Sequence, residues 1–274
     1  MNTGNISGIC NICGNKVLFE DTDTLRPRES FNCPVCASNS RMRLLFYTIG
    51  LFSGNRGPSN AWRENKDIRI FEASGDGRYS AYLHRVFNYI NTRYDHEVIK
   101  TKDFNPNEYA DLQRLHFDDG SFHMVVTTDV FEHVRLYKDA LKEVYRVLKP
   151  EGVFILQIPY NHSMDHTIER LELRDDGDVN ILPARYHAGN TLVYREYGRD
   201  ILSAVRDAGF GVGYLAVELP RHAVPLQDII VAARSPYLDI SALVRMTIPP
   251  DDGRFMGMLR RLLGMTGPKE EIVL

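Results

Sequence analysis

The segment HMVVTTDVFEHVRLYKDALKEVYRVLKPEGVFILQIPY (residues 123–160) predicts a strand, a helix and a second strand in direct succession. Residues 123–130 are rich in valine and threonine, which favour strands. Residues 136–149 repeat apolar side chains at the spacing of one helix face, and Pro150 and Gly152 then end the helix. The apolar residues 152–160 follow at once as a strand. This alternation predicts a parallel sheet covered by helices on both faces. The apolar helix positions are Leu136, Ala140, Leu141, Val144, Val147 and Leu148.

The same alternation continues on both sides of this segment, so we expect one α/β domain over residues 67–235. Its last two strands are joined by a short link, which predicts an antiparallel hairpin at the sheet edge. Residues 161–195 have little periodicity and many charges, and we expect them to form an insertion over the ligand end of the sheet. The remaining helices are expected at residues 38–52, 78–87 and 196–210, and the remaining strands at 67–74, 87–92, 211–219 and 226–235.

All four cysteines of the chain lie near its N-terminus, in two Cys-x-x-Cys pairs: Cys10, Cys13, Cys33 and Cys36. Four thiolates in such pairs suit a tetrahedral Zn²⁺ ion, and a site closed by four ligands is structural. The alternatives are two disulfides, which a reducing cytoplasm disfavours, or four free thiols. We therefore expect a small zinc ribbon at residues 1–45, followed by a linker at residues 46–66.

The bulk composition excludes several classes of protein. A net charge of -3 gives no basic field for nucleic acid or an anionic membrane. No apolar run approaches the ~18 residues of a membrane span, and the N-terminus lacks a secretory signal pattern. We therefore expect a cytoplasmic protein without a transmembrane segment.

The tail, residues 236–274, contains an amphipathic pattern at residues 254–265. Apolar residues recur at helical spacing from Phe255 to Leu263, and Arg254, Arg260 and Arg261 lie on the other side. We expect this helix to pack on its own domain or on a second subunit of a homodimer. The alternative is a helix that lies on a membrane surface.

The stretch FEASGDGRYS (residues 71–80) follows the first strand and indicates a ligand. Its glycines, Gly75 and Gly77, let the backbone approach a ligand closely. A dinucleotide fold would have a third glycine at Ser80, and the acid Glu72 would repel a pyrophosphate. S-adenosylmethionine (SAM) has an ammonium, a sulfonium and ribose hydroxyls but no phosphate, so it suits this acid better.

Motifs that follow in order resemble the class I SAM-dependent methyltransferases of the ubiquinone/menaquinone-biosynthesis-like superfamily. They are Asp111-Leu112, Ser121-Phe122-His123, Val130-Phe131-Glu132-His133-Val134 and Leu148-Lys149-Pro150-Glu151-Gly152. The later run from Pro183 to His187, with Tyr197-Gly198, resembles a narrower bacterial group that often carries an N-terminal zinc ribbon. The resemblance covers roughly residues 67–235. It implies a Rossmann-like, seven-stranded, mostly parallel sheet with a C-terminal antiparallel hairpin.

The resemblance also implies roles for single residues. Glu72 and the backbone of Ala73, Ser74, Gly75 and Gly77 would hold the methionine end of SAM, and Asp111 and Leu112 would flank adenine. Thr128 and Asp129 would face the methyl group and the acceptor. The structural alternatives are a helix cap or solvated loop acid for Asp111 and a helix N-cap for Asp129. Histidines suit a general base, so the catalytic candidates are Asp129, His133, His162 and His187.

Three positions depart from the superfamily pattern. Arg93 stands where an acid usually binds the ribose hydroxyls, so either Asp95 takes this role or ribose binding is weaker. His123 replaces a common aspartate and Glu151 the first glycine of a Gly-Gly pair. The position of Arg93 keeps open a SAM-binding or scaffold protein without catalysis.

The sequence therefore predicts a SAM-dependent methyltransferase that acts on a small molecule or saccharide, at a hydroxyl oxygen. An RNA methyltransferase that contacts its substrate through the ribbon is the alternative. However, the first 60 residues hold only two more basic than acidic side chains, and the base-methylating Pro-Pro-aromatic turn is missing after Thr128. Nucleic acid is therefore not the expected partner.

Overall fold

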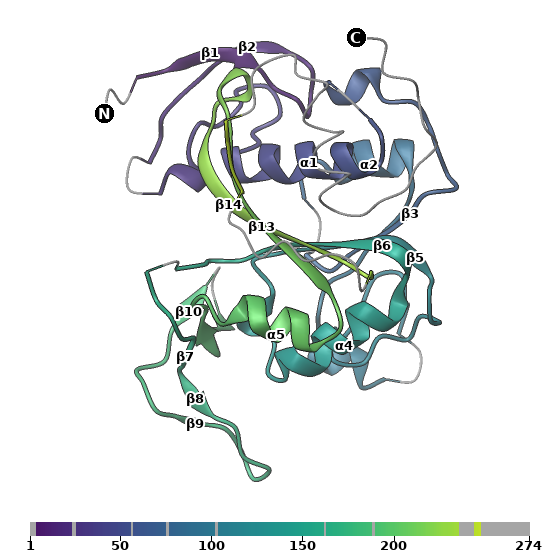
Figure 1. The fold of residues 1–274 in the computed structure, drawn as a ribbon, viewed down its shortest axis with the longest axis vertical. Helices are drawn as coiled ribbons and strands as arrows, with labels where there is room; N and C mark the ends of the chain where they lie inside the picture. The colour runs from purple at the N-terminus through teal and green to yellow at the C-terminus, as the bar shows by residue number, and fades with distance from the viewer. Residues whose placement is uncertain are drawn as a thin grey trace.

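A computed structural model describes residues 4–23, 26–55, 57–74, 77–101, 104–161, 163–187 and 190–235, together with the backbone of residues 244–247. Its centre is a seven-stranded sheet with the order β15-β13-β14-β6-β5-β3-β4 (Figure 1). The strands are β3 (Arg69–Glu72), β4 (Asn88–Asn91), β5 (Phe122–Thr128), β6 (Leu148–Gln157), β13 (Gly211–Leu219), β14 (Val224–Ala233) and β15 (Val244–Thr247).

The strand directions confirm the predicted fold class. Strands β3, β4, β5 and β6 run parallel, whereas β14 is antiparallel to both β6 and β13. The sheet edges differ from the prediction. Strand β15 pairs with β13, so the hairpin is not the edge, and beyond β4 the pairing shrinks to one bridge between Arg93 and Tyr109. The tail thus supplies the seventh strand.

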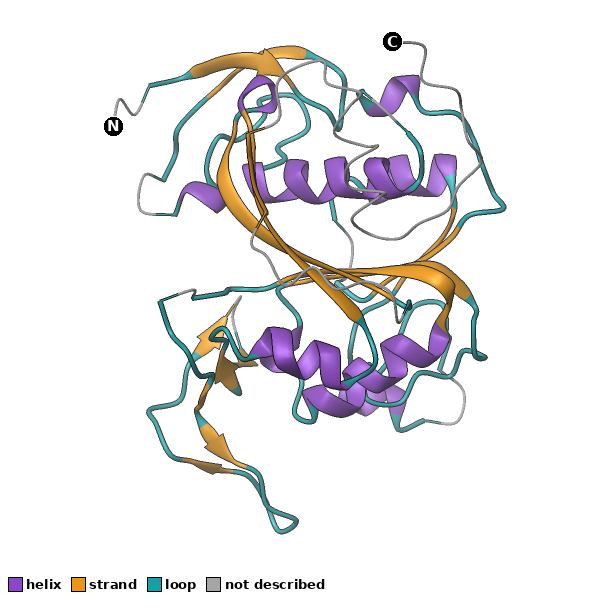
Figure 2. Ribbon diagram, in the orientation of Figure 1, coloured by secondary structure: helices purple, strands orange, loops and turns teal. Residues whose placement is uncertain are grey.

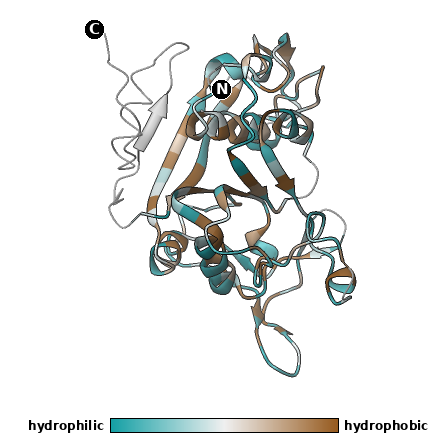
Figure 3. Cartoon of the chain, turned by 90° about the vertical axis from the view of Figure 1, so that its right-hand side faces the viewer, coloured by the Kyte–Doolittle hydropathy of each residue, from teal (hydrophilic) through white to brown (hydrophobic). Residues whose placement is uncertain are grey.

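Helices cover both faces of the sheet (Figure 2). Helices α1 (Ser40–Phe52) and α2 (Ser80–Val86) lie on one face, and α4 (Tyr137–Val147) and α5 (Ile201–Asp207) on the other; α3 (His96–Ile99) is a single turn. Successive residues of β5 point to opposite faces, and both faces are buried, which explains its continuous apolar run. Hydrophobic residues accordingly concentrate on the strands between the helices (Figure 3).

The predicted apolar face of α4 faces the core. Ala140, Leu141, Val144 and Val147 are fully buried, and so is Leu148 at the C-cap. Leu136 is the exception, because it precedes the helix and its side chain is 39% exposed. The turn after α4 has Glu151 where the superfamily usually has a glycine, and this residue has an unusual backbone conformation. Glu151 adopts φ 63°, a left-handed conformation that glycine reaches with less strain.

The cysteine-containing module shares its core with the sheet. Strands β1 (Ile6–Ile9) and β2 (Lys16–Phe19) pair antiparallel, and two 3-10 turns follow, η1 (Pro27–Glu29) and η2 (Ser59–Ala61). Ile12 and Phe19 belong to one hydrophobic cluster with Leu44 of α1 and Met124 of β5. The predicted boundary between residues 45 and 46 falls inside α1. The predicted linker, residues 46–66, therefore contains half of a core helix.

The tip of the β13–β14 hairpin also reaches the cysteine module. It forms a 3-10 turn, η4 (Pro220–His222). The His222 Nδ1–H donates to the Ile9 carbonyl at 2.6 Å. The buried Arg43 of α1 donates to the carbonyl oxygens of His222 and Ala223 at 2.7 and 3.0 Å. Three segments far apart in sequence are thus joined at one place.

Residues 161–195 form a series of two-residue strands: β7 (Ile168–Glu169), β8 (Leu171–Glu172), β9 (Val179–Asn180), β10 (Tyr186–His187), β11 (Thr191–Leu192) and β12 (Arg195–Glu196). The β8–β9 pair projects away from the body of the molecule (Figure 1). The returning strand β12 is anchored. Arg195 is buried and donates to the carbonyl oxygens of Val134 and, at 2.8 Å, Arg135. These carbonyls follow η3 (Phe131–His133), the turn after β5.

The predicted amphipathic helix at residues 254–265 lies outside the described residues. Within the described part of the chain, none of the helices has the length and apolar character needed to cross a membrane.

Candidate active site

A cleft of 1930 Å³ opens at the carboxyl ends of β3, β5 and β6. Open parallel sheets bind ligands at this edge, because the strand-to-helix turns there leave room for them. The turn after β3 is tied to β5, since the Thr128 N–H donates to Ser74 Oγ at 2.8 Å. The cysteine module and α1 form one wall of the cleft, and residues 185–196 of the insertion form another.

The structure brings most of the predicted SAM-binding residues to this cleft. Those that line it are Ala73, Ser74, Gly77, Asp111, Leu112, Thr128 and Asp129. Gly75 lies outside the described residues. At Gly77 an added Cβ would come within 2.8 Å of the Tyr79 ring, so this position requires glycine. Asp111 accepts from the Gln113 backbone N–H at 2.9 Å, as in the predicted alternative of a local cap, while it also lines the cleft.

Glu72 lies beneath the cleft and does not line it. Its carboxylate is fully buried and accepts hydrogen bonds from the Tyr79 hydroxyl at 2.5 Å and the Tyr89 hydroxyl at 2.7 Å. Burial and the neighbouring carboxylate raise the pKa of Tyr79 well above its usual value, so the phenol stays a donor. Tyr79 itself lines the cleft. Glu72 therefore supports the cleft wall through Tyr79 instead of facing it.

The part of the cleft next to β4 differs from the expected pattern. Asp95 does not line the cleft, because it caps α3 and accepts from the N–H groups of Glu97 and Val98 at 3.0 and 3.1 Å. Arg93 does line it. Its guanidinium lies 4.7 Å from the centre of the Tyr109 ring and donates to the Tyr109 hydroxyl at 2.7 Å. Asp95 could contact a ribose only if its side chain gave up these two hydrogen bonds at the start of α3.

Two arginines of the N-terminal region hold Asp129, and sequence reasoning missed both. Asp129 follows β5 with a left-handed φ of 51°, which aspartate tolerates better than most residues. Its carboxylate oxygens contact Arg28 at 2.9 Å and Arg41 at 3.2 Å. Arg41 also pairs with Glu29 at 2.7 Å and donates to Thr128 Oγ1 at 3.0 Å. No local pattern could have revealed these pairs, since about a hundred residues separate the partners.

Glu132, His133 and His187 form a cluster beside Asp129, and all three line the cleft. The side chain of Glu132 is only 2% exposed. Its Oε1 lies 3.8 Å from Nε2 of His133 and 3.7 Å from Nδ1 of His187. The His133 Nδ1–H donates to the Leu192 carbonyl at 2.7 Å. The sequence motif identified His133 and His187 as candidates but left Glu132 unassigned, although the Glu-His pair was part of the motif. His162 lies outside the described residues.

Burial controls the protonation of this cluster. It raises the pKa of Glu132 to about 8, and the nearby Asp129 adds to the shift. It also lowers the pKa of His133, and burial and the charge of His133 lower that of His187. Both imidazoles are therefore neutral near pH 7 and can accept a proton or bind a cation.

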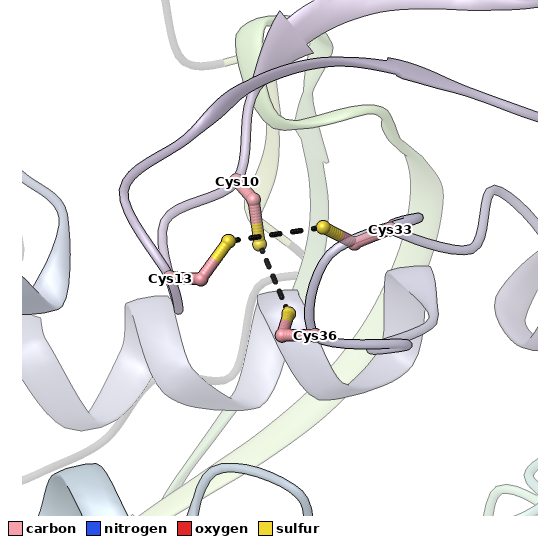
Figure 4. A group of neighbouring side chains, drawn as sticks. All are labelled: Cys10, Cys13, Cys33 and Cys36. Atoms are coloured by element: carbon pink, nitrogen blue, oxygen red, sulfur yellow. Dashed lines mark hydrogen bonds between the residues drawn. The ribbon is translucent and has the colours of Figure 1, made fainter.

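The four cysteines come together in a separate, closed site (Figure 4). The Sγ atoms of Cys10 and Cys36 are 3.6 Å apart and those of Cys13 and Cys33 are 3.8 Å apart. These distances exclude disulfides in this arrangement. Four sulfurs at ~2.3 Å from one Zn²⁺ ion would lie about 3.8 Å from each other. The site therefore fits a tetrahedral zinc ion.

Residues 72–156 match the family described as "Methyltransferase domain". This segment begins at the last residue of β3, contains the turn after it, and ends in β6, so it supplies the central part of the cleft. The chain therefore contains a methyltransferase domain over these residues.

Solved structures of methyltransferases are similar to this chain. One is a SAM-dependent methyltransferase from Mesorhizobium loti, with 15% identity over 61% of this chain and 90% of that chain and a TM-score of 0.42. Another is from Methanosarcina mazei, with 14% identity over 62% and 93% and a TM-score of 0.40. A third is Burkholderia thailandensis 1,6-didemethyltoxoflavin-N1-methyltransferase, with 16% identity over 62% and 71% and a TM-score of 0.35. No curated protein sequence matches the chain.

The cleft of this methyltransferase suits SAM as its cofactor. Ala73, Ser74 and Gly77, on either side of this turn, line the cleft where they can offer backbone groups to a ligand. Asp111 and the buried Leu112 offer one polar and one apolar contact on the side next to β4. When bound, SAM supplies the activated methyl group, and the protein aligns the acceptor with it.

Proposed function

We propose that this methyltransferase transfers the methyl group of SAM to a hydroxyl oxygen of a small molecule or saccharide. The observation that supports this proposal most directly is the cluster of Glu132, His133 and His187 beside Thr128 and Asp129. A hydroxyl must lose its proton when it is methylated, and the two neutral imidazoles of this cluster lie in the cleft, where they can accept it.

The residues take separate roles in this proposal. The turn from Ala73 to Gly77 holds the methionine end of SAM, and Asp111 and Leu112 flank adenine. Thr128 and Asp129 lie next to the methyl group, where Arg28 and Arg41 fix the Asp129 carboxylate. The new bond joins the acceptor oxygen to the methyl carbon as the bond between that carbon and sulfur breaks. The hydroxyl proton passes to the cluster, and S-adenosylhomocysteine leaves.

Aromatic and charged side chains that line the cleft support a polar acceptor of modest size. Tyr160, Tyr186 and Tyr194 line the cleft together with the ion pair of Arg185 and Glu196 at 3.0 Å. Aromatic faces next to hydrogen-bonding groups suit a ring with hydroxyl substituents. The insertion and α1 close two sides of the cleft, which favours a small acceptor over a folded macromolecule.

Calorimetric titration with SAM, followed by acceptor screening with methyl-labelled SAM, tests this function. We expect Asp111→Ala to weaken SAM binding and His187→Asn to leave it unchanged while methyl transfer falls about 100-fold or more. Transfer of the labelled methyl group to RNA, together with an affinity of the protein for RNA that falls steeply with salt, would support an RNA methyltransferase instead. Stoichiometric SAM binding without a labelled product from any acceptor pool would support a non-catalytic role.

The same proposal includes a structural Zn²⁺ ion on Cys10, Cys13, Cys33 and Cys36. It also includes a cytoplasmic location, because reducing conditions keep the four thiols available to the metal. The ion would hold the turns that carry η1 and α1, and with them Arg28 and Arg41.

A further inference from the structure

We propose that Glu132, His133 and His187 bind a divalent first-row transition-metal ion, at a second metal site distinct from the four cysteines. The first observation is the state of Glu132. Both of its carboxylate oxygens are buried, and within the described structure neither has a hydrogen-bond partner. A buried carboxylate without a partner is costly, so native structures normally pair it or bind it to a metal.

The spacing of the three side chains is the second observation. The distances of 3.7 and 3.8 Å from Glu132 Oε1 to the two imidazole nitrogens are too long for hydrogen bonds. Donors bound at ~2.1 Å to one ion lie about 3.0 to 3.5 Å apart. The three donor atoms all lie within 4.8 Å of one another, so a shift of a few tenths of an ångström places them around one ion.

The orientation of His133 is the third observation. Its Nδ1–H donates to the Leu192 carbonyl, which leaves Nε2 without a proton on the side of Glu132. Metal-binding histidines are commonly held in this way by a backbone carbonyl. The same segment also anchors the backbone of the cluster, because the Tyr194 N–H donates to the Glu132 carbonyl at 2.8 Å.

The neighbouring arginines form their ion pairs with other acids than Glu132. Arg28 and Arg41 form their ion pairs with Asp129 and Glu29, at 2.7 to 3.9 Å. The donor set also separates the two metal sites chemically. Four thiolates select Zn²⁺, whereas one carboxylate and two imidazoles accept Mn²⁺, Fe²⁺, Co²⁺ or Zn²⁺.

Three protein ligands leave coordination positions open, and the two imidazoles line the cleft. An acceptor hydroxyl could bind the ion there, and a bound cation makes a hydroxyl easier to deprotonate; with both imidazoles bound to the ion, the proton would pass to water in the cleft. This catalytic use rests on the proposed function. The metal site itself does not, because its three side chains and their spacing are independent of the acceptor.

The test is a titration of the full chain, loaded with a single equivalent of zinc for the four cysteines, with Mn²⁺ in the absence of SAM and acceptor. The loss of the electron paramagnetic resonance signal of free Mn²⁺ measures binding. We expect one Mn²⁺ per chain, with affinity reduced roughly 10-fold or more in Glu132→Gln and His187→Asn. The matched controls are His166→Asn and Glu172→Gln, on exposed positions of the same insertion, and they should bind as the wild type does.

The proposal is overturned if the wild type binds neither Mn²⁺ nor Co²⁺, or if Glu132→Gln and the wild type bind equally. Urea unfolding of each variant checks that it folds. His187 lies on a partly exposed hairpin, so His187→Asn keeps the test decisive if Glu132→Gln fails to fold. Metal binding without methyl transfer would support this site and count against the proposed acceptor class only.

Discussion

At the scale of the residue, two buried glutamates have opposite surroundings. Glu72 receives two tyrosine hydroxyls, whereas both oxygens of Glu132 lack a partner within the described structure. A buried charge is tolerated where hydrogen bonds replace the lost water. Glu72 therefore has its hydrogen bonds satisfied under the cleft, whereas Glu132 is the acid that the proposed metal site uses.

Tyr89→Phe tests the structural role of Glu72. The change removes a hydrogen bond of 2.7 Å to a buried carboxylate, and such bonds are worth about 1.5–3 kcal/mol. We expect the free energy of unfolding, measured in urea, to fall by this amount. Tyr94→Phe, at a position 58% exposed, is the control and should stay within about 0.5 kcal/mol of the wild type. Equal losses in both variants would contradict this role.

The stability of the protein should also depend on pH through His222. Burial lowers the pKa of this imidazole, and the charges of Arg221 and Arg43 lower it further. In the unfolded chain histidine takes up a proton near its ordinary pKa of about 6.5, while the folded form resists it. The unfolded state then binds more protons, so the unfolding free energy should fall as the pH drops below this value.

Urea unfolding between pH 7.5 and 5.5 measures this effect as the difference between the wild type and His222→Asn. The wild type should lose more stability on acidification than the variant. His84→Asn, at an exposed position, should keep the full wild-type slope. If the unfolding free energy of His222→Asn depends on pH as steeply as that of the wild type, His222 does not contribute to the pH dependence of stability.

At the scale of the element, α1 serves both the core and the cleft. Arg41 reaches Asp129, whereas Phe46 stacks on Trp62 with ring centres 4.3 Å apart. Both aromatic side chains are buried, although they lie in the predicted linker. The helix therefore connects the cysteine module to the cleft.

Phe46→Ala tests whether α1 belongs to the core. Truncation of a fully buried phenylalanine costs about 3–5 kcal/mol through lost burial and the cavity that remains. Trp62 is the single tryptophan of the chain, so its fluorescence reports the docking of α1 directly. Leu18→Ala, at a position 48% exposed, should have little effect. A linker would tolerate both changes equally.

At the scale of the whole molecule, the cysteine module and one face of the sheet form a single hydrophobic cluster. The hairpin tip at His222 and the side chain of Arg43 connect the two by hydrogen bonds. The proposed zinc ion would therefore stabilise the whole protein and not only the residues around it.

Removal of zinc should lower the thermal stability of the entire chain. We expect one zinc per chain by elemental analysis, none in Cys33→Ser, and a single unfolding transition at a lower temperature after chelation. The affinity of the protein for SAM should fall together with its thermal stability, because without zinc the cysteine module no longer holds Arg41 against Asp129. Two separate transitions, with the second unchanged by chelation, would instead show an independent module.

The sequence by itself determined the sheet and the chemistry of its edge. The strands at residues 211–219 and in β5 and β6 follow from their apolar runs, because strands buried on both faces are apolar throughout, and the buried face of α4 follows from its helical periodicity. Short motifs also located the turn after β3 and Asp111, since contacts within a few residues are written in the local sequence.

Only the tertiary structure decided which side chains meet across long separations. The pairs of Arg28 and Arg41 with Asp129, the burial of Glu72 under Tyr79, and the approach of His187 to Glu132 each depend on how distant segments pack. Local patterns do not encode such contacts, because burial and pairing depend on the whole core. The same reason explains why α1 looked like a connection in the sequence and is part of the core in the fold.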